Sequence, residues 1–211
     1  ADGIWSSVRA QMYDEGPVKA KSADGMTTQQ CPYSGYTVFA GETVLPIGDY
    51  YECGYKVYIG PKKYFVTSDV GDGRVQWYSF LALPPGTKRA GDSWEGGSSS
   101  DAEGKDVIAY IKDLHEGWTP EIAEVLDATP AASVEQRDLY DRWPEFRRSW
   151  ADGNVVLIGD AVHPMMPNLG QGGGMAIEDA LVLGQELRRS NLDAVPLALT
   201  QYNRNRALRA A

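Results

Sequence analysis

The spacing of apolar residues changes along the chain and predicts regions of different architecture. Between residues 36 and 80, short runs of aromatic and β-branched residues alternate with turn residues, which is typical of strands. The turns at Gly60-Pro61 and Gly71-Asp72-Gly73 are too short for crossover helices, so we predict an antiparallel sheet. The expected strands are residues 36–39, 55–59, 64–67 and 75–80.

After this region the apolar spacing becomes helical. We expect helices over residues 107–114 and 121–126, the second opened by Thr119-Pro120. Residues 133–143 alternate loosely and are expected to return to the sheet.

The last third of the chain has a third pattern. Asn154 to Asp160 is a continuous apolar run ended by Gly-Asp, which is typical of a strand buried on both faces of a parallel sheet. Such a strand needs parallel neighbours, and the sequence contains no convincing second one, so we predict a partner segment outside it. A Gly-rich loop and a helix follow, and Pro196 opens a last helix. The apolar stripe expected on the first of these helices is Ala176, Ala180, Leu183 and Leu187.

Composition narrows the classes of function. The 211 residues include 20 basic and 29 acidic side chains, and the formal net charge of -9 argues against a nucleic-acid partner. No apolar run approaches the roughly 20 residues of a membrane span. Two cysteines, Cys31 and Cys53, which could pair or stay thiols, and two histidines make a zinc site improbable. We therefore expect no metal and no transmembrane segment.

The Gly159-Asp160 turn and the glycines after it carry the candidate chemistry. A carboxylate at the end of such a strand can accept hydrogen bonds from ligand hydroxyls. Glycines at the start of a helix let backbone approach a flat ligand, and the helix end favours a negative group. A polyhydroxyl chain leading to a ring that becomes anionic, as in reduced flavin, fits this pattern. By spacing alone, a plain glycine loop capped by Asp160 fits equally well.

Two stretches together resemble a known family. Residues 159–164 and 167–180 resemble the second FAD fingerprint of the flavoprotein monooxygenases similar to p-hydroxybenzoate hydroxylase. Residues 1–9 resemble the middle fingerprint of that family, which touches FAD and the path of the nicotinamide cofactor. Nearly the whole chain is similar to the zeaxanthin epoxidase branch, apart from apparent insertions near residues 14–30 and 88–100. The stretches that carry this likeness are residues 33–37, 63–71, 75–78, 137–142 and 175–179.

The resemblance implies an α+β or α/β fragment of that FAD fold. It would combine an antiparallel substrate-domain sheet with the C-terminal part of a Rossmann-like FAD domain, with the first ADP-binding βαβ unit missing. Residues 1–30 would be a middle segment of the FAD-binding domain, 31–145 the substrate domain, and 146–211 the last part of the FAD-binding domain. Without that missing unit, we expect the fragment alone to be inactive.

The resemblance also implies roles for single residues. Asp160 would bind the ribityl hydroxyls, and backbone N–H groups of the glycine loop would meet the pyrophosphate and the pyrimidine end of the flavin. Asp2 and Gly3 would lie near the FAD ribose or pyrophosphate, and Arg9 near the phosphates of the reductant or simply at the surface. The implied cofactor-binding residues are Asp2, Gly3, Arg9, Gly159, Asp160, Pro167, Gly170, Gln171, Gly172, Gly173, Gly174 and Met175.

No side chain is assigned a catalytic role, because in this family a flavin hydroperoxide transfers the oxygen. His163 is therefore expected to be a structural part of the loop. Four aromatic residues could line a pocket for a long apolar polyene, although filling the core of the sheet is the favoured interpretation. They are Tyr64, Phe65, Trp77 and Tyr78. The arginines from 188 to 209 are expected to solvate helices or to meet anionic lipid headgroups.

The implied function is FAD-dependent epoxidation of the β-rings of zeaxanthin through antheraxanthin to violaxanthin, with O2 and with NADPH or reduced ferredoxin. It implies a carotenoid substrate and a chloroplast location, peripheral to the stromal side of the thylakoid, with a larger photosynthetic assembly as a candidate partner. Two alternatives remain open. One is an aromatic-ring hydroxylase of the same family, and the other is a truncated, non-catalytic homologue that serves as a binding subunit.

Overall fold

The computed structural model describes residues 2–15, 31–45, 54–84, 87, 101–143 and 147–210, without the side chains of 101–106, 169 and 192. The expected insertion beyond residue 15, the Gly/Ser-rich stretch 88–100 and Cys53 lie outside these residues. The chain divides into two compact units. We call Gly35–Leu139 the sheet unit, and Ala1–Ser34 with Tyr140–Ala211 the helical unit.

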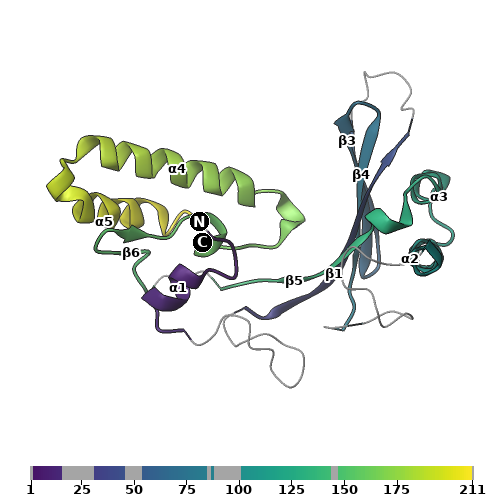
Figure 1. Cartoon of the computed structure of the whole chain (residues 1–211), viewed down its shortest axis with the longest axis horizontal. Coiled ribbons are helices and arrows are strands. Elements are labelled where there is room, and N and C mark those ends of the chain that lie inside the picture. The colour runs from purple at the N-terminus through teal and green to yellow at the C-terminus, as the bar shows by residue number, and fades with distance from the viewer. Residues whose placement is uncertain are drawn as a thin grey trace. The chain divides into compact units, whose positions relative to one another are not determined.

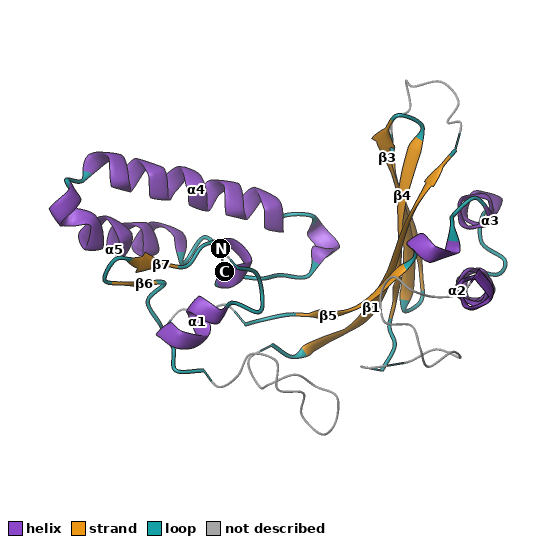
Figure 2. Ribbon diagram, in the orientation of Figure 1, coloured by secondary structure: helices purple, strands orange, loops and turns teal. Residues whose placement is uncertain are grey.

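The sheet has five strands in the order β2-β3-β4-β1-β5 (Figures 1 and 2). Their bounds are β1 (Tyr33–Val44), β2 (Tyr55–Gly60), β3 (Lys63–Gly71), β4 (Arg74–Leu81) and β5 (Glu135–Tyr140). The pairs β2–β3, β3–β4 and β1–β4 are antiparallel, which confirms the predicted sheet. The β3–β4 turn holds Asp72 and Gly73 at φ of 55° and 69°, the positive values that a tight hairpin turn requires.

Two helices, α2 (Asp101–Leu114) and α3 (Pro120–Asp127), cover one face of this sheet (Figure 1). Both were predicted, as was the start of α3, where Thr119 is the N-cap and Pro120 opens the helix. Phe39 and Trp77 on the sheet are packed with Ile111 and Leu126 on the helices in a shared hydrophobic core. A short 3-10 helix, η2 (Ala131–Ser133), leads into β5.

Side chains along β3 and β4 point alternately to the two faces of the sheet, so the four aromatic residues proposed for a substrate pocket lie on opposite faces. Phe65 and Trp77 are fully buried on the helix-covered face, where their rings stack with centroids 5.6 Å apart. Trp77 Nε1 donates to Thr129 Oγ1 at 2.8 Å. The favoured interpretation, that these side chains fill the core of the sheet, is confirmed for Phe65 and Trp77. The pocket alternative is wrong for them, because odd-numbered positions of β3 and β4 face the helices. Tyr64 and Tyr78 belong to a second cluster, around Phe80, on the other face.

The helical unit consists of short elements and two longer helices. They are α1 (Ser7–Met12), β6 (Ala151–Asp152), β7 (Val155–Val156), η3 (Gly159–Ala161), η4 (Pro167–Leu169), α4 (Gly172–Arg189), η5 (Leu192–Ala194) and α5 (Val195–Arg206). The helices α4 and α5 pack against each other (Figure 1). None of the helices within the described part of the chain is both long enough and apolar enough to span a membrane.

The apolar run 154–160 does not form the expected strand. Only Val155–Val156 forms a strand, and it pairs antiparallel with β6 in a two-stranded hairpin. Val155 is 43% exposed, so this run is not buried on both faces. Its apolar residues serve a local core instead, where Leu157 contacts the cluster of Trp150 and Tyr202.

The predicted stripe on α4 is also wrong. Ala180 and Leu187 are exposed, and the buried residue of this helix is Asp179. Its partner on α5 is Arg206, which is 1% exposed and ion-paired with Asp179, so it does not solvate a helix as expected. Because a buried charge needs its counter-ion, this ion pair, and not the apolar stripe, selects the inward face of α4.

Candidate functional site

The helix α4 begins with an end that its own N-cap residue does not cap. Its N-cap residue is Gln171, whose side chain makes no capping hydrogen bond, and the first amide to find a helical carbonyl is that of Met175, which donates to Gln171 O. The amides of Gly172, Gly173 and Gly174 therefore belong to the helical turn that lacks intrahelical partners. Such an end favours a negative group.

The glycines around this end serve different purposes. Gly170 has φ of 62° and Gly159 has φ of 57°, so both need the left-handed backbone that glycine tolerates. An added Cβ on Gly159 would also lie 3.4 Å from the Cβ of Ala176, so the absence of a side chain here lets the backbone of the turn approach α4 closely. By contrast, a Cβ on Gly173 or Gly174 would meet nothing within 4 Å. Packing within the described residues does not explain those two glycines, whereas a ligand resting on the helix end would.

The predicted ribityl-binding carboxylate, Asp160, lies in the single turn η3 and is exposed. It is therefore available to accept hydrogen bonds from outside the chain. Pro167 opens the next turn, η4, and is exposed as well.

Beneath Asp160 lies a buried cluster centred on Asp179. The Asp179 carboxylate accepts the Gly159 amide at 2.7 Å, faces His163 Nε2 at 2.6 Å, and accepts Arg206 Nε at 2.7 Å. Burial would raise the pKa of Asp179, but the hydrogen bonds from His163, Gly159 and Arg206 outweigh it and lower that pKa. Because a carboxylate can only accept, His163 carries a proton on Nε2 in this contact.

A second buried cluster holds the other side of the same turn. Arg9 donates from Nη1 to the carbonyl of Ala161 at 2.7 Å, and its Nε lies 3.2 Å from Glu15. Arg142 reaches the same Glu15 at 2.7 Å. Arg9 is only 1% exposed, so it is neither a surface charge nor open to the phosphates of a reductant, contrary to both expectations. Its guanidinium instead pairs with Glu15 and holds the backbone carbonyl of Ala161.

Asp2 has a local role in the structure. Its carboxylate accepts the amides of Ser7 at 2.8 Å and Val8 at 3.3 Å, which caps α1. A hydrogen bond from the Ser6 side chain, which exceeds the opposing effect of burial, lowers the pKa of Asp2, and backbone amides lower it further. Gly3 follows at φ of 78°. The predicted contact of both residues with FAD stays a prediction.

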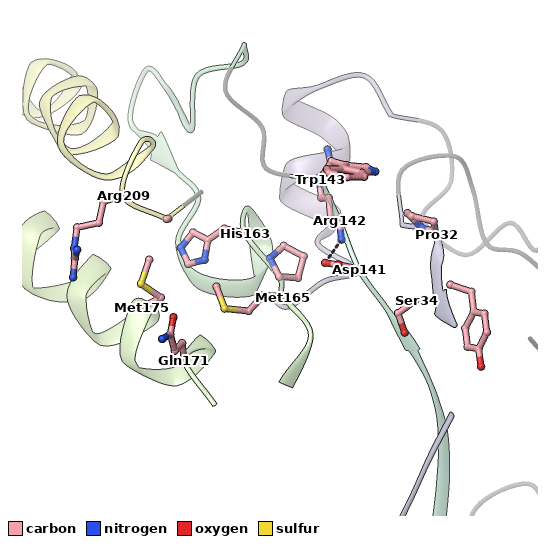
Figure 3. Close-up of a pocket in the computed structure, with 13 residues that line it drawn as sticks. Pro32, Ser34, Asp141, Arg142, Trp143, His163, Met165, Gln171, Met175 and Arg209 are labelled. Carbon is pink, nitrogen blue, oxygen red and sulfur yellow. Dashed lines mark hydrogen bonds between the residues drawn. The ribbon is translucent and has the colours of Figure 1, made fainter. Parts of the chain in front are cut away.

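A cavity of about 460 Å³ lies within the helical unit (Figure 3). Part of its wall comes from the loop after η3 and the start of α4, including His163, Met165, Gln171 and Met175. Further lining comes from the residues at 141–143 after β5, from Pro32, Tyr33 and Ser34, and from Arg209 and Ala210. Two of the predicted cofactor-binding residues, Gln171 and Met175, thus face a space large enough for a ring system.

A sequence model described as FAD binding domain matches residues 99–211, which is more than half of the chain. The chain belongs to this family.

Its relatives agree with that assignment. The chain is 36% identical to chloroplastic zeaxanthin epoxidase of an Oncidium hybrid cultivar, over 100% of this chain and 29% of the relative. It is 39% identical to the chloroplastic zeaxanthin epoxidase of Nicotiana plumbaginifolia, over 99% of this chain and 28% of the relative. The chain therefore spans less than a third of the length of these curated relatives.

A solved structure supports the fold. Klebsiella pneumoniae HpxO complexed with FAD and uric acid matches with a TM-score of 0.74 and 26% identity, over 100% of this chain and 46% of that one. These findings confirm the predicted family, the FAD-binding character and the fold class as an α+β fragment of this fold.

The site fits the cofactor of this FAD-binding family. Gly173 and Gly174 leave a cradle that a Cβ would fill, the uncapped amides suit an anionic group, and Asp160 is a free acceptor for hydroxyls. The structure thus brings Asp160 and the glycine loop into one unit with Gln171 and Met175, while Arg9 serves the fold.

Sequence reasoning missed the residues that hold the site together. Asp179, Arg206 and Glu15 carry the buried charge, and none of them was singled out. A signal did exist for Asp179, because it lies one turn after Met175 and one turn before Leu183, on the side of the helix that becomes buried. An acidic residue at such a position indicates a buried partner.

Proposed function

We propose that the protein carrying this chain is an FAD-dependent monooxygenase that epoxidises the β-rings of zeaxanthin to antheraxanthin and violaxanthin. The observation that carries the proposal is the pair of glycines at the start of α4 that no contact within the described residues requires, beside an exposed Asp160. The names of the relatives, which are 36% and 39% identical along the whole chain, supply the substrate.

Each part of the site has a task in this function. Bound FAD would supply the activation of O2, with electrons from NADPH or reduced ferredoxin. Asp160 would accept hydrogen bonds from the ribityl hydroxyls, and the amides of residues 172–174, at the start of α4, would meet the pyrophosphate and the pyrimidine end of the flavin. The positive end of the α4 dipole favours the negative charge of the reduced ring. Pro167 shapes the loop beside it.

A carotenoid needs an apolar wall. Tyr64 stacks on Phe80 with ring centroids 4.2 Å apart, and Tyr36 and Tyr78 join the same cluster on the sheet face that α2 and α3 do not cover. Tyr64 is partly buried there, and burial, with the nearby tyrosines Tyr36 and Tyr55, raises its pKa to about 12, so its hydroxyl stays neutral. We infer that this face, and not the core side with Phe65 and Trp77, offers contact to a polyene.

The substrate sets the place of action. A carotenoid dissolves in the thylakoid membrane, so the protein acts in the chloroplast, at the stromal surface of that membrane, where a larger photosynthetic assembly is a candidate partner. The relatives named chloroplastic support this location.

The test uses the full-length protein that carries this chain. It is purified, its flavin content is read from absorbance, and it is incubated with zeaxanthin, O2 and either NADPH or reduced ferredoxin. We expect stoichiometric FAD and both epoxides. A parallel incubation replaces zeaxanthin with an aromatic acid. Bound flavin that hydroxylates the aromatic acid and yields no epoxide from zeaxanthin would favour the ring hydroxylase, and a protein without flavin would favour the non-catalytic homologue.

A further inference from the structure

The turn that carries Asp160 is held from both sides by buried charges of opposite sign. Before Asp160, the amide of Gly159 donates to the Asp179 carboxylate at 2.7 Å. After it, the carbonyl of Ala161 accepts from the Arg9 guanidinium at 2.7 Å. Asp160 is exposed between these two anchors, so its backbone is fixed while its side chain stays available.

The anchor on Asp179 is built to hold its charge. The Asp179 carboxylate is 0% exposed, and its hydrogen-bond partners His163 and Arg206 are 4% and 1% exposed. A buried carboxylate persists as an anion only with such donors, and a hydrogen bond to a buried anion is among the strong ones. The ring of His163 belongs to the loop that follows the turn, so a single carboxylate ties α4, α5, the turn and the loop.

A purely architectural role does not account for the Gly159 contact. Pairing α4 with α5 needs only the bond between Asp179 and Arg206, and Glu178 beside it already pairs with both Arg206 and Arg209. Yet the second carboxylate oxygen of Asp179, Oδ2, is the one that meets Gly159 and His163, on the side of the flavin-binding loop.

We propose that Asp179 is a positioning residue for FAD, which acts by fixing the turn Gly159–Ala161 so that the Asp160 carboxylate meets the ribityl chain. The inference rests on the proposed function only in taking FAD as the ligand of Asp160. It predicts that the effect of Asp179 on FAD affinity depends on the Asp160 carboxylate. A residue that only stabilises the fold has no such dependence.

The experiment is a double-mutant cycle on the FAD dissociation constant of the full-length protein, with Asp160→Asn, Asp179→Asn and the double variant. We expect each single substitution to weaken binding about tenfold or more, as for the loss of a charged hydrogen bond. The double variant should be no more than about twofold weaker than the weaker single variant. Effects that multiply, with normal FAD binding by the unaltered protein, would overturn the proposal.

A second readout needs no cofactor. In the flavin-free protein, hydrogen exchange of the peptide that contains Gly159 should accelerate in Asp179→Asn, because its amide loses the anionic acceptor. The matched control is Glu178→Gln at the neighbouring position, which should leave the exchange of this peptide unchanged. Any effect of Glu178→Gln on the FAD dissociation constant should multiply with the effect of Asp160→Asn, because the two act independently. Unaltered exchange at Gly159 in Asp179→Asn would also overturn the proposal.

Folding is controlled separately. If Asp179→Asn does not fold, His163→Gln takes its place in the cycle, because it replaces the imidazole that contacts Asp179 and leaves the carboxylate that accepts the Gly159 amide. Coupling to Asp160 is expected there too, and its absence counts against the proposal. Bound FAD with intact coupling but no epoxide would overturn the proposed function alone, whereas failure of the unaltered protein to bind FAD would overturn both.

Discussion

The two units of the chain bury different kinds of polar group. In the sheet unit, the buried polar side chains are neutral hydroxyls, such as Thr37, Ser79 and Thr129, together with His115, and no buried Asp, Glu, Lys or Arg occurs among its described residues. In the helical unit most of the buried polar side chains described are Asp or Arg. Arg9, Asp179 and Arg206 are all at most 1% exposed.

This difference teaches how each unit gains its shape. The sheet unit is a hydrophobic sandwich of sheet and helices, and its buried threonine hydroxyls add single hydrogen bonds to it, such as that of Thr129 to the Val125 carbonyl. The helical unit has a smaller core and joins distant segments through ions, so that α1, the Asp160 turn, α4 and α5 meet at charged contacts. Ionic contacts are directional, which suits a unit that must aim backbone at a ligand.

The largest expected loss is in the sheet unit. Trp77→Ala removes a fully buried indole and its hydrogen bond to Thr129, and we expect it to lower the free energy of unfolding by about 3–5 kcal/mol. The control is Tyr78→Ala, the next residue on β4, which faces the other side and is only partly buried. Hydrogen exchange resolved by peptide, under rising denaturant, assigns the loss to the sheet unit. An equal loss in both variants would contradict the described core.

In the helical unit, the corresponding change is the removal of one ion. Arg206→Met leaves Asp179 with less compensation, and we expect about 3 kcal/mol of destabilisation. A double variant, Arg206→Met with Asp179→Leu, tests the cause of this loss. It should be more stable than Arg206→Met alone, because replacing a whole buried ion pair by apolar residues often leaves the free energy of unfolding nearly unchanged. A double variant as unstable as the single one would show that burial of charge is not the dominant cost. Denaturant unfolding of the helical-unit peptides is the measurement.

The same contrast explains what could be predicted from the sequence. Strands β1 to β4 and the helix α3 follow from local signals, because alternation, turn glycines and the Thr119-Pro120 start are encoded within a few residues. The glycine loop and Asp160 were likewise readable, since a motif is contiguous. The inward face of α4 was not, because Asp179 is selected by Arg206, which lies 27 residues away in the chain.

Long-range charge also explains the errors at Arg9 and in the apolar run. The partners of Arg9 include the carbonyl of Ala161, at a sequence separation of 152 residues, and no local pattern announces such a contact. The continuous apolar run at 154–160 indicates burial, but it does not say which segment pairs with the run. In the structure that segment is the two-residue strand β6, and no parallel strand pairs with the run within the described residues. For Phe65 and Trp77 the sequence left a pocket role open beside the favoured core role, because alternation gives two faces without saying which one the helices cover.

As the pH is lowered, the two units should lose stability in different pH ranges. Burial lowers the pKa of His115 in the sheet unit below its ordinary value of about 6.5, so the unfolded state binds the proton more tightly and stability falls as pH drops below that value. The pKa of Asp179 is lowered from about 3.9, so its contribution is complete above that pH and is lost only as pH falls through the folded value.

Hydrogen exchange at stepwise lower pH checks this order. Peptides of the sheet unit should lose protection first, below about pH 6.5, and His115→Gln should abolish this early step. Peptides around Gly159 should change only near or below about pH 4. Loss of protection in the reverse order would break the assignment of the titrating groups.

The smallest expected effect on stability comes from the glycine that the chain itself does not require. Gly173 has room for a Cβ, with nothing within 4 Å, so Gly173→Ala should stabilise the flavin-free protein by about 0.5 kcal/mol through helix propensity. The same methyl group would stand where FAD approaches, so the FAD dissociation constant should rise about tenfold or more, a change of about 1.4 kcal/mol or more. Gly184→Ala, further along α4 and equally open, is the matched control that should stabilise alike and leave FAD affinity unchanged. Equal FAD affinity in both variants would mean that the start of α4 does not contact the cofactor, and the reason for its glycines would have to be sought elsewhere.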